Sequence, residues 1–115
     1  MELELQHEFL ADENERSEAK THFLDIFGNG KTKSLSITVG PYKDTGFEKK
    51  LGEYLNYKLG ITSSSVSEKG FFSKKRTSVF ITKPIRVSEE SMSNLSNAFY
   101  DVILAFGVKV DVAEV

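Results

Sequence analysis

Few side chains in this sequence could carry catalysis, and they lie far apart along the chain. The protein has two histidines and no cysteine, so thiol nucleophiles and thiolate metal sites are excluded. His7 and His22 would lie opposite each other in a hairpin, but a zinc site needs at least one further ligand. No serine stands in a Gly-x-Ser-x-Gly turn. We therefore predict a protein without enzymatic activity, metal or cofactor.

Cations and aromatic rings are found together in the middle of the chain. Residues 69–76 read Lys-Gly-Phe-Phe-Ser-Lys-Lys-Arg. Lysine and arginine bind phosphates and exposed rings stack on bases, so a groove with both binds single strands without reading their sequence. Phe71 and Phe72 are neighbours in a predicted strand, so only one of them can face the core. The sequence predicts a nucleic-acid-binding surface that comprises Lys31, Lys33, Lys69, Phe71, Phe72, Lys74, Lys75, Arg76, Lys83 and Arg86.

The net charge of −2 hides an uneven distribution along the chain. Residues 1–30 carry a charge of −6, residues 31–86 a charge of +8, and residues 87–115 a charge of −4. A basic centre between acidic ends fits an anionic partner, but charged runs also form ordinary solvated faces. Both interpretations remain open from the sequence.

The elements that would position these residues begin with three predicted strands, near residues 2–10, 20–27 and 33–40. Polar and apolar residues alternate in the first and third, which is the pattern of half-buried strands. Gly28-Asn29-Gly30 is typical of a tight hairpin turn. We predict an antiparallel meander of the three strands. Ala19, Leu24 and Phe27 also fit a helix over residues 18–27, which is the alternative.

The rest of the chain alternates predicted helices and strands. Apolar residues at helical spacing predict a helix from Asp44 or Thr45 to about Leu59 and another from Ser88 to Gly107. Strands are predicted over residues 62–72, 77–82 and 108–112, with a hairpin loop at 73–76. The order β-β-β-α-β-β-α-β predicts a single α+β domain over residues 1–115.

Two architectures fit this order of elements. In the first, the meander, one helix and the next hairpin form a small OB-like antiparallel β-barrel, with the last helix and strand appended. In the second, the strand at 34–39 begins a ferredoxin-like β-α-β-β-α-β unit, and the N-terminal hairpin is the appendage. Both are scaffolds of nucleic-acid-binding proteins, although fold alone does not determine function.

Over residues 1–86, the element order and the segment 71–76 resemble the small OB-type single-stranded DNA-binding proteins of bacteriophages. The resemblance implies sequence-nonspecific DNA binding in replication or recombination, with a replication or recombination protein as a further partner. Unlike that family, this chain ends in a predicted helix and strand instead of an acidic tail. Residues 35–39 and 76–81 are also similar to the central strands of RNA-recognition motifs, but Thr77 and Ser78 replace the glycine and first aromatic of that motif.

A non-enzymatic protein-interaction module, such as a phage-type inhibitor or an assembly adaptor, is the alternative function. Edge strands at both ends of the chain favour it, because they can pair with another protein or with a second copy. We therefore expect a homo-oligomer, dimeric or larger. The acidic N-terminus is unlike a signal peptide, and the longest apolar run, residues 102–106, is too short to span a bilayer. We expect a cytoplasmic protein without a membrane partner.

Overall fold

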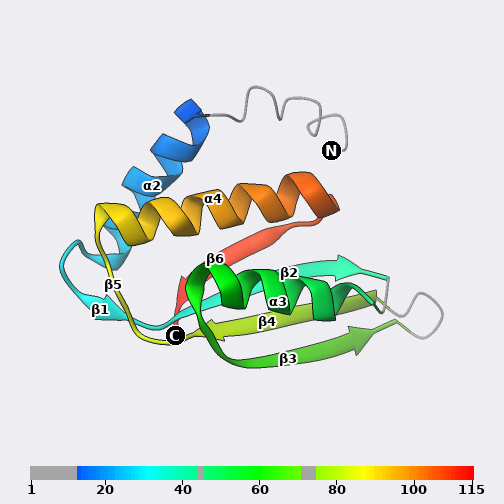
Figure 1. Cartoon of the computed structure of the whole chain (residues 1–115). Helices are drawn as coiled ribbons and strands as arrows, with labels where there is room; N and C mark the ends of the chain where they lie inside the picture. The colour runs from blue at the N-terminus through cyan, green and yellow to red at the C-terminus, as the bar shows by residue number, and fades with distance from the viewer. Residues whose placement is uncertain (1–12, 44–45, 71–74) are drawn as a thin grey trace.

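The computed structural model describes residues 13–43, 46–70 and 75–115 (Figure 1). The helices in this part of the chain are α2 (Glu13–Phe27), α3 (Phe47–Leu59) and α4 (Glu89–Phe106). The longer strands are β2 (Leu35–Tyr42), β3 (Ile61–Lys69), β4 (Lys75–Thr82) and β6 (Val110–Glu114). Two short strands, β1 (Thr32–Lys33) and β5 (Ile85–Arg86), pair with each other. The predicted α+β class is confirmed.

The four longer strands form one antiparallel sheet in the order β3-β4-β2-β6. Read along the chain, β2-α3-β3-β4-α4-β6 is the β-α-β-β-α-β order of the ferredoxin-like alternative. The described strands close into no barrel, so the OB-like barrel is not confirmed. Strands β2 and β4 are the central pair, in the positions that the similarity to RNA-recognition motifs predicted for residues 35–39 and 76–81.

The prediction of a strand over residues 20–27 is wrong, because these residues belong to helix α2. Ala19, Phe23 and Phe27 lie four residues apart and pack into the core. The ring of Phe23 stacks on Phe27 at 5.9 Å and meets Phe99 of α4 edge-on at 5.9 Å. Burial of this helical stripe outweighs the β propensity of the segment. The predicted strand at 2–10, with His7, lies outside the described residues.

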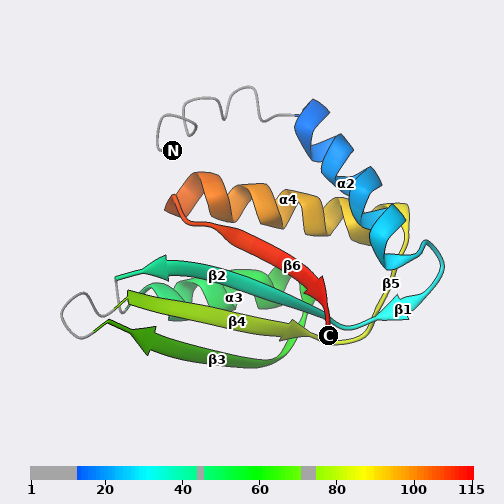
Figure 2. The same ribbon diagram turned by 180° about the vertical axis from the view of Figure 1, so that it is seen from behind.

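Helices α3 and α4 cover one face of the sheet, and no described helix covers the other (Figures 1 and 2). The alternation in β2 explains this arrangement, because Leu35, Ile37 and Val39 are buried towards the helices. Leu51 of α3 and Leu95 of α4 are buried in the same core. The opposite side of the sheet is called the open face here.

The predicted helix ends in the second half of the chain are largely confirmed. Ser88 caps α4, since its Oγ accepts a hydrogen bond from the backbone N–H of Ser91, whose own hydroxyl accepts from the N–H of Ser88. Gly107 closes α4 in a left-handed conformation. The predicted caps Asp44 and Thr45 lie outside the described residues. Lys75 and Arg76 begin β4 instead of lying in the hairpin loop. No helix in the described ranges is long and apolar enough to cross a membrane.

Candidate nucleic-acid interface

The open face is built from alternate residues of four strands, because side chains that are paired across strands share a face. Its centre is half-buried, and its margins on the edge strands are exposed. The cross-strand pairs Ser67–Thr77, Ser65–Val79 and Thr38–Val79 establish this face. Its members on the four strands are Ser63, Ser65, Ser67, Lys69, Lys75, Thr77, Val79, Ile81, Ser36, Thr38, Asp111 and Ala113. The result is a surface rich in hydroxyls around Val79 and Ile81, with Lys69 and Lys75 at one end and the Asp111 carboxylate on β6.

Three exposed lysines lie at the hairpin end of the open face. Lys69 and Lys75 are direct cross-strand partners. Lys109 continues the β2–β6 pairing, because its carbonyl accepts a hydrogen bond from Gly40 N–H at 3.0 Å. It precedes the buried Val110, so alternation directs it to the open face. None of the three forms an ion pair with a described residue. We call Lys69, Lys75 and Lys109 the cationic end.

The cationic end is suited to an anion for a physical reason. Like charges directly opposite each other on neighbouring strands destabilise a sheet, and Lys69 and Lys75 are such a pair. A hollow of about 390 Å³ adjoins them and is lined also by Pro41, Gly70 and Thr77. A phosphate there would relieve the repulsion and accept hydrogen bonds from the ammonium groups and from the Thr77 hydroxyl.

Arg76, although next to Lys75 in the sequence, points to the helix side of the sheet. Its Nε donates to Glu48 Oε2 at 2.6 Å, and its Nη1 donates to Glu68 Oε2 at 3.1 Å. The hydroxyl of Tyr42 donates to the same Glu48 oxygen at 2.9 Å and is hydrogen-bonded to Ser78. Desolvation works to raise the pKa of Glu48, but the hydrogen bonds from Arg76 and Tyr42 outweigh it and lower that pKa. Arg76 therefore joins α3 to the sheet. Its guanidinium lies against two carboxylates on the helix side, away from the open face.

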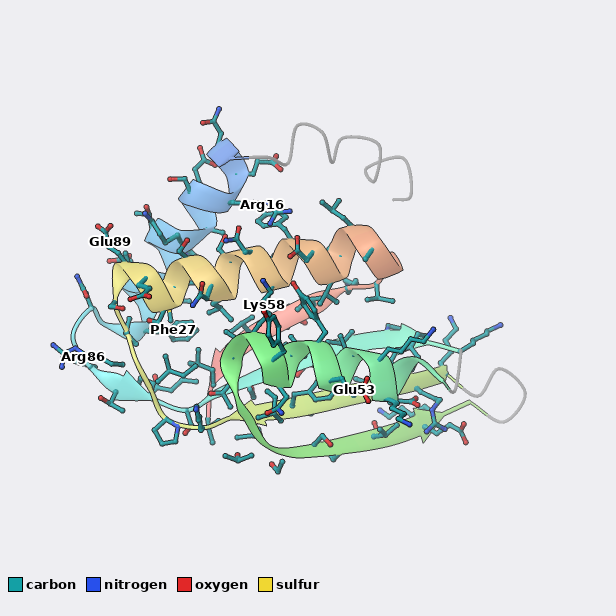
Figure 3. The ribbon with its side chains drawn as sticks, in the orientation of Figure 1. Arg16, Phe27, Glu53, Lys58, Arg86 and Glu89 are labelled. Atoms are coloured by element: carbon teal, nitrogen blue, oxygen red, sulfur yellow. The ribbon has the colours of Figure 1, made fainter. Side chains whose placement is uncertain are left out.

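The remaining predicted cations lie at the opposite end of the sheet. Lys83 follows β4 and lies eight positions after Lys75, which corresponds to roughly 26 Å along an extended strand. Lys31 precedes β1, and Arg86 belongs to β5 (Figure 3). Lys33 pairs with Glu114 at 2.5 Å between Nζ and Oε2. The structure thus brings Lys69 and Lys75 together and separates them from Lys31, Lys33, Lys83 and Arg86.

Aromatic stacking finds no support on the described part of the open face. Phe80 and Tyr42 are buried on the helix side, and the exposed Tyr57 belongs to α3. The predicted stacking residues Phe71 and Phe72, and also Lys74, lie outside the described residues. Lys109 is the residue that the sequence-based prediction missed. The alternation of Val108, Lys109 and Val110 predicts that Lys109 lies on the other face of the strand from the valines. A search for basic segments does not find it, because residues 87–115 are acidic overall.

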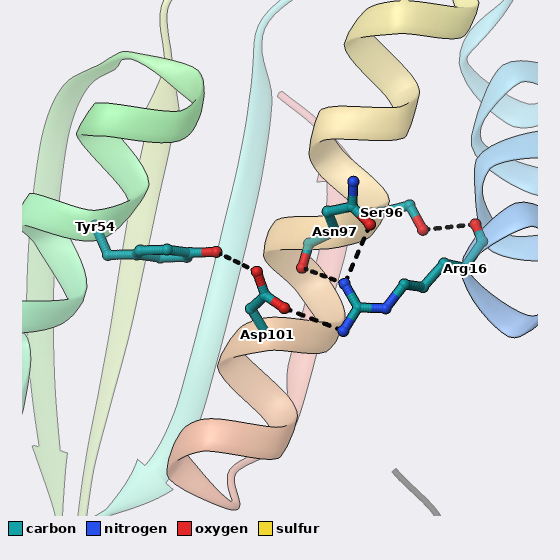
Figure 4. A network of polar contacts seen from close by, with 5 residues as sticks. All are labelled: Arg16, Tyr54, Ser96, Asn97 and Asp101. Atoms are coloured by element: carbon teal, nitrogen blue, oxygen red, sulfur yellow. Dashed lines mark hydrogen bonds and ion pairs between the residues drawn. The ribbon is translucent and has the colours of Figure 1, made fainter. Parts of the chain in front are cut away.

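A second polar cluster lies between the helices and has a structural role (Figure 4). Arg16 of α2 pairs with Asp101 of α4 at 3.0 Å between Nη2 and Oδ1, and its Nη1 donates to Asn97 Oδ1 at 3.1 Å. Tyr54 of α3 donates to the other Asp101 oxygen at 2.6 Å. Burial and the neighbouring carboxylate raise the pKa of Tyr54. Ser96 Oγ donates to the Arg16 carbonyl at 2.7 Å. These contacts join the three described helices, and no buried side-chain nitrogen or oxygen in the described residues lacks a hydrogen-bond partner.

In the described residues no group of three or more histidine, aspartate or glutamate side chains could hold a metal ion. His22 is exposed on α2. No protein-family model, curated protein or solved structure matched this chain.

Proposed function

We propose that this protein is a non-catalytic binder of single-stranded nucleic acid, with the strand lying on the open face and its phosphates at the cationic end. The observation that carries the proposal is the cross-strand pair Lys69–Lys75, two exposed like charges with no described counterion on an uncovered sheet face. Lys109 adds a third cation on the other side of Gly40.

The shape of the face favours a single strand over a duplex. Four-stranded sheets of this kind bind unpaired nucleotides, because splayed bases can lie flat on the strands. A duplex groove is entered by a protruding helix or ribbon, and both α3 and α4 lie on the opposite side of the sheet. Val79 and Ile81 offer apolar contact to bases and sugars. Hydroxyls along β2 and β3 offer hydrogen bonds that do not distinguish one base from another.

Salt dependence of binding tests the proposal. Three phosphate contacts predict a log–log slope of about −2 for a single strand, since each contributes about −0.7. Alanine at Lys69, Lys75 and Lys109 together is expected to abolish most of this slope and to weaken binding strongly at low salt. Fluorescence anisotropy with labelled oligo-dT, oligo-rU and a duplex gives the affinities.

The matched control removes the same charge from the other end of the sheet, with alanine at Lys31, Lys83 and Arg86. These three side chains are exposed, and the control is expected to keep the slope of the parent. Equal losses in both triple variants would show that overall charge, and not the cationic end, is responsible. No binding by the parent, or a preference for duplex, would contradict the proposal.

A protein-binding role is the second candidate function. It is favoured by β3, whose residues from Thr62 to Lys69 are all exposed and whose outer edge is paired with no described strand. A partner that supplies a β-strand would extend the sheet there. If the titrations show no binding of single-stranded nucleic acid, binding of a protein partner at the edge of β3 becomes the leading proposal.

A further inference from the structure

Strand β3 is the longer of the two edge strands of the four-stranded sheet. An edge strand presents a row of unpaired N–H and C=O groups, which proteins usually protect by prolines, charges, bulges or a short strand. Strand β3 has nine residues and no proline. Its irregularity lies between Ile61 and Ser63, and its charges are confined to Glu68 and Lys69. The stretch from Ser63 to Ser67 is regular and uncharged.

The side of β3 that faces α3 is also uncovered. A hollow of about 440 Å³ separates α3 from the strand and is lined by Lys49, Gly52, Ser64 and Val66, among others. Val66 is 42% exposed, and it is the one apolar side chain between Thr62 and Lys69. A strand added at this edge would therefore cover both backbone groups and an exposed aliphatic side chain.

We propose that the occupant of this edge is β3 of a second copy, paired antiparallel about a two-fold axis that passes through Val66. Homodimers of this symmetry use the same patch on both copies, so the patch must be complementary to itself. The regular part of β3 runs from Ser63 to Lys69, and Val66 is its midpoint. The dimer would join two four-stranded sheets into one continuous sheet.

The pairing in this register is favourable at every position. Val66 meets Val66 of the second copy, so each covers the other on the helix side. Ser65 then faces Ser67 of the second copy, and Ser64 faces Glu68, whose carboxylate accepts a hydrogen bond from a hydroxyl. Ser63 faces Lys69 on the open face. Like charges would meet only in registers centred on Glu68 or Lys69, which pair much less of the strand.

The proposed dimer does not depend on nucleic-acid binding, but it would enlarge the open face. The two open faces would form one surface, with a cationic end at two diagonal corners. In this register the two Lys69 residues are six positions apart along the strands, which is about 20 Å. One long oligonucleotide could then contact both cationic ends.

Charge substitution at the axis tests the dimer. We expect Val66→Lys and Val66→Glu each to be monomeric by size-exclusion chromatography with light scattering, because each places two like charges on the axis. An equimolar mixture of the two variants is expected to restore a dimer, because lysine and glutamate then face each other. This rescue depends on Val66 meeting its own copy, which no other register provides.

Two control variants keep the experiment specific. Val66→Thr retains a branched side chain, and Ser64→Lys places a cation opposite Glu68, so both are expected to remain dimeric. Thermal melts followed by circular dichroism confirm that every variant is folded. A parent protein that is monomeric at its highest soluble concentration would overturn the proposal. A parent dimer that survives Val66→Lys unchanged would overturn it as well.

Discussion

At the scale of single residues, neighbours in the sequence have opposite roles. Lys75 and Arg76 are adjacent, yet alternation directs Lys75 to the open face and Arg76 to two carboxylates on the helix side. A count of cations in the segment 69–76 therefore overstates the charge that a ligand would meet. Among the described cations of this segment, Lys69 and Lys75 form no ion pair with a described residue.

Lys75→Glu is predicted to stabilise the fold and to weaken nucleic-acid binding. The substitution turns a like-charge cross-strand pair into an opposite-charge pair, which is worth about 0.2–1 kcal/mol. It also removes a cation from the cationic end. Urea unfolding midpoints and oligonucleotide titration measure the two effects. Lys83→Glu, which makes the same change of charge beyond the end of β4, is the control and should give neither effect.

Protonation of the Glu48 carboxylate is expected to destabilise the fold in acid. Its pKa in the folded protein is lowered from an ordinary value of 4.5, with desolvation opposing the effect and hydrogen bonds from Arg76 and Tyr42 prevailing. A lowered pKa stabilises the fold above the ordinary value, and this stabilisation is lost as the pH falls through the lower one. The free energy of unfolding should therefore decrease below about pH 4.5. Urea midpoints of Glu48→Gln should decrease less steeply there, whereas exposed Glu53→Gln should follow the parent.

At the scale of elements, the long periodic segments are the predictable ones. Helices α3 and α4 and strands β2 and β4 lie close to their predicted ranges, because each has a clear apolar period. Strand β3 also lies near its predicted range, although its serine-rich sequence has no apolar period. Residues 20–27 of helix α2 are predicted as a strand, because they are individually β-prone, and the helical alternative over residues 18–27 is the one that the structure confirms. The helical conformation is stabilised by the aromatic pair Phe23 and Phe27, because Phe23 also packs against Phe99 of α4. A partner from another part of the chain is not visible in a local pattern.

Docking of α2 is predicted to depend on Phe23. This side chain is 6% exposed and contacts Phe27 and Phe99, so Phe23→Ala should cost about 3–5 kcal/mol of unfolding free energy. The neighbouring Ile26 is 48% exposed, so Ile26→Ala should change the stability by about 0.5 kcal/mol or less. Chemical denaturation of both variants makes the comparison. Equal losses would mean that α2 is held mainly by the polar contacts of Arg16.

At the scale of the whole molecule, the sequence left two architectures open and could not choose between them. The choice depends on which strands are neighbours, and the pairing of β2 with both β4 and β6 joins residues far apart in the chain. Because strand neighbours are not visible in the sequence, the residues of the candidate site could be predicted only in part. The predicted cations were grouped by their place in the sequence, whereas the sheet carries Lys83 to one end and Lys75 to the other. Lys109 reaches the cationic end through β6, which pairs beside β2.

The position of β6 also affects how this protein can be made. Leu35 pairs with Glu114 and Val39 with Val110, so one side of the central strand β2 stays open until residues 110–114 have left the ribosome. At about 5–20 residues per second, synthesis takes seconds to pass from β2 to β6. During that time the backbone edge of β2 that β6 will cover is unpaired. The sheet is therefore completed only after residues 110–114 are free to pair with β2.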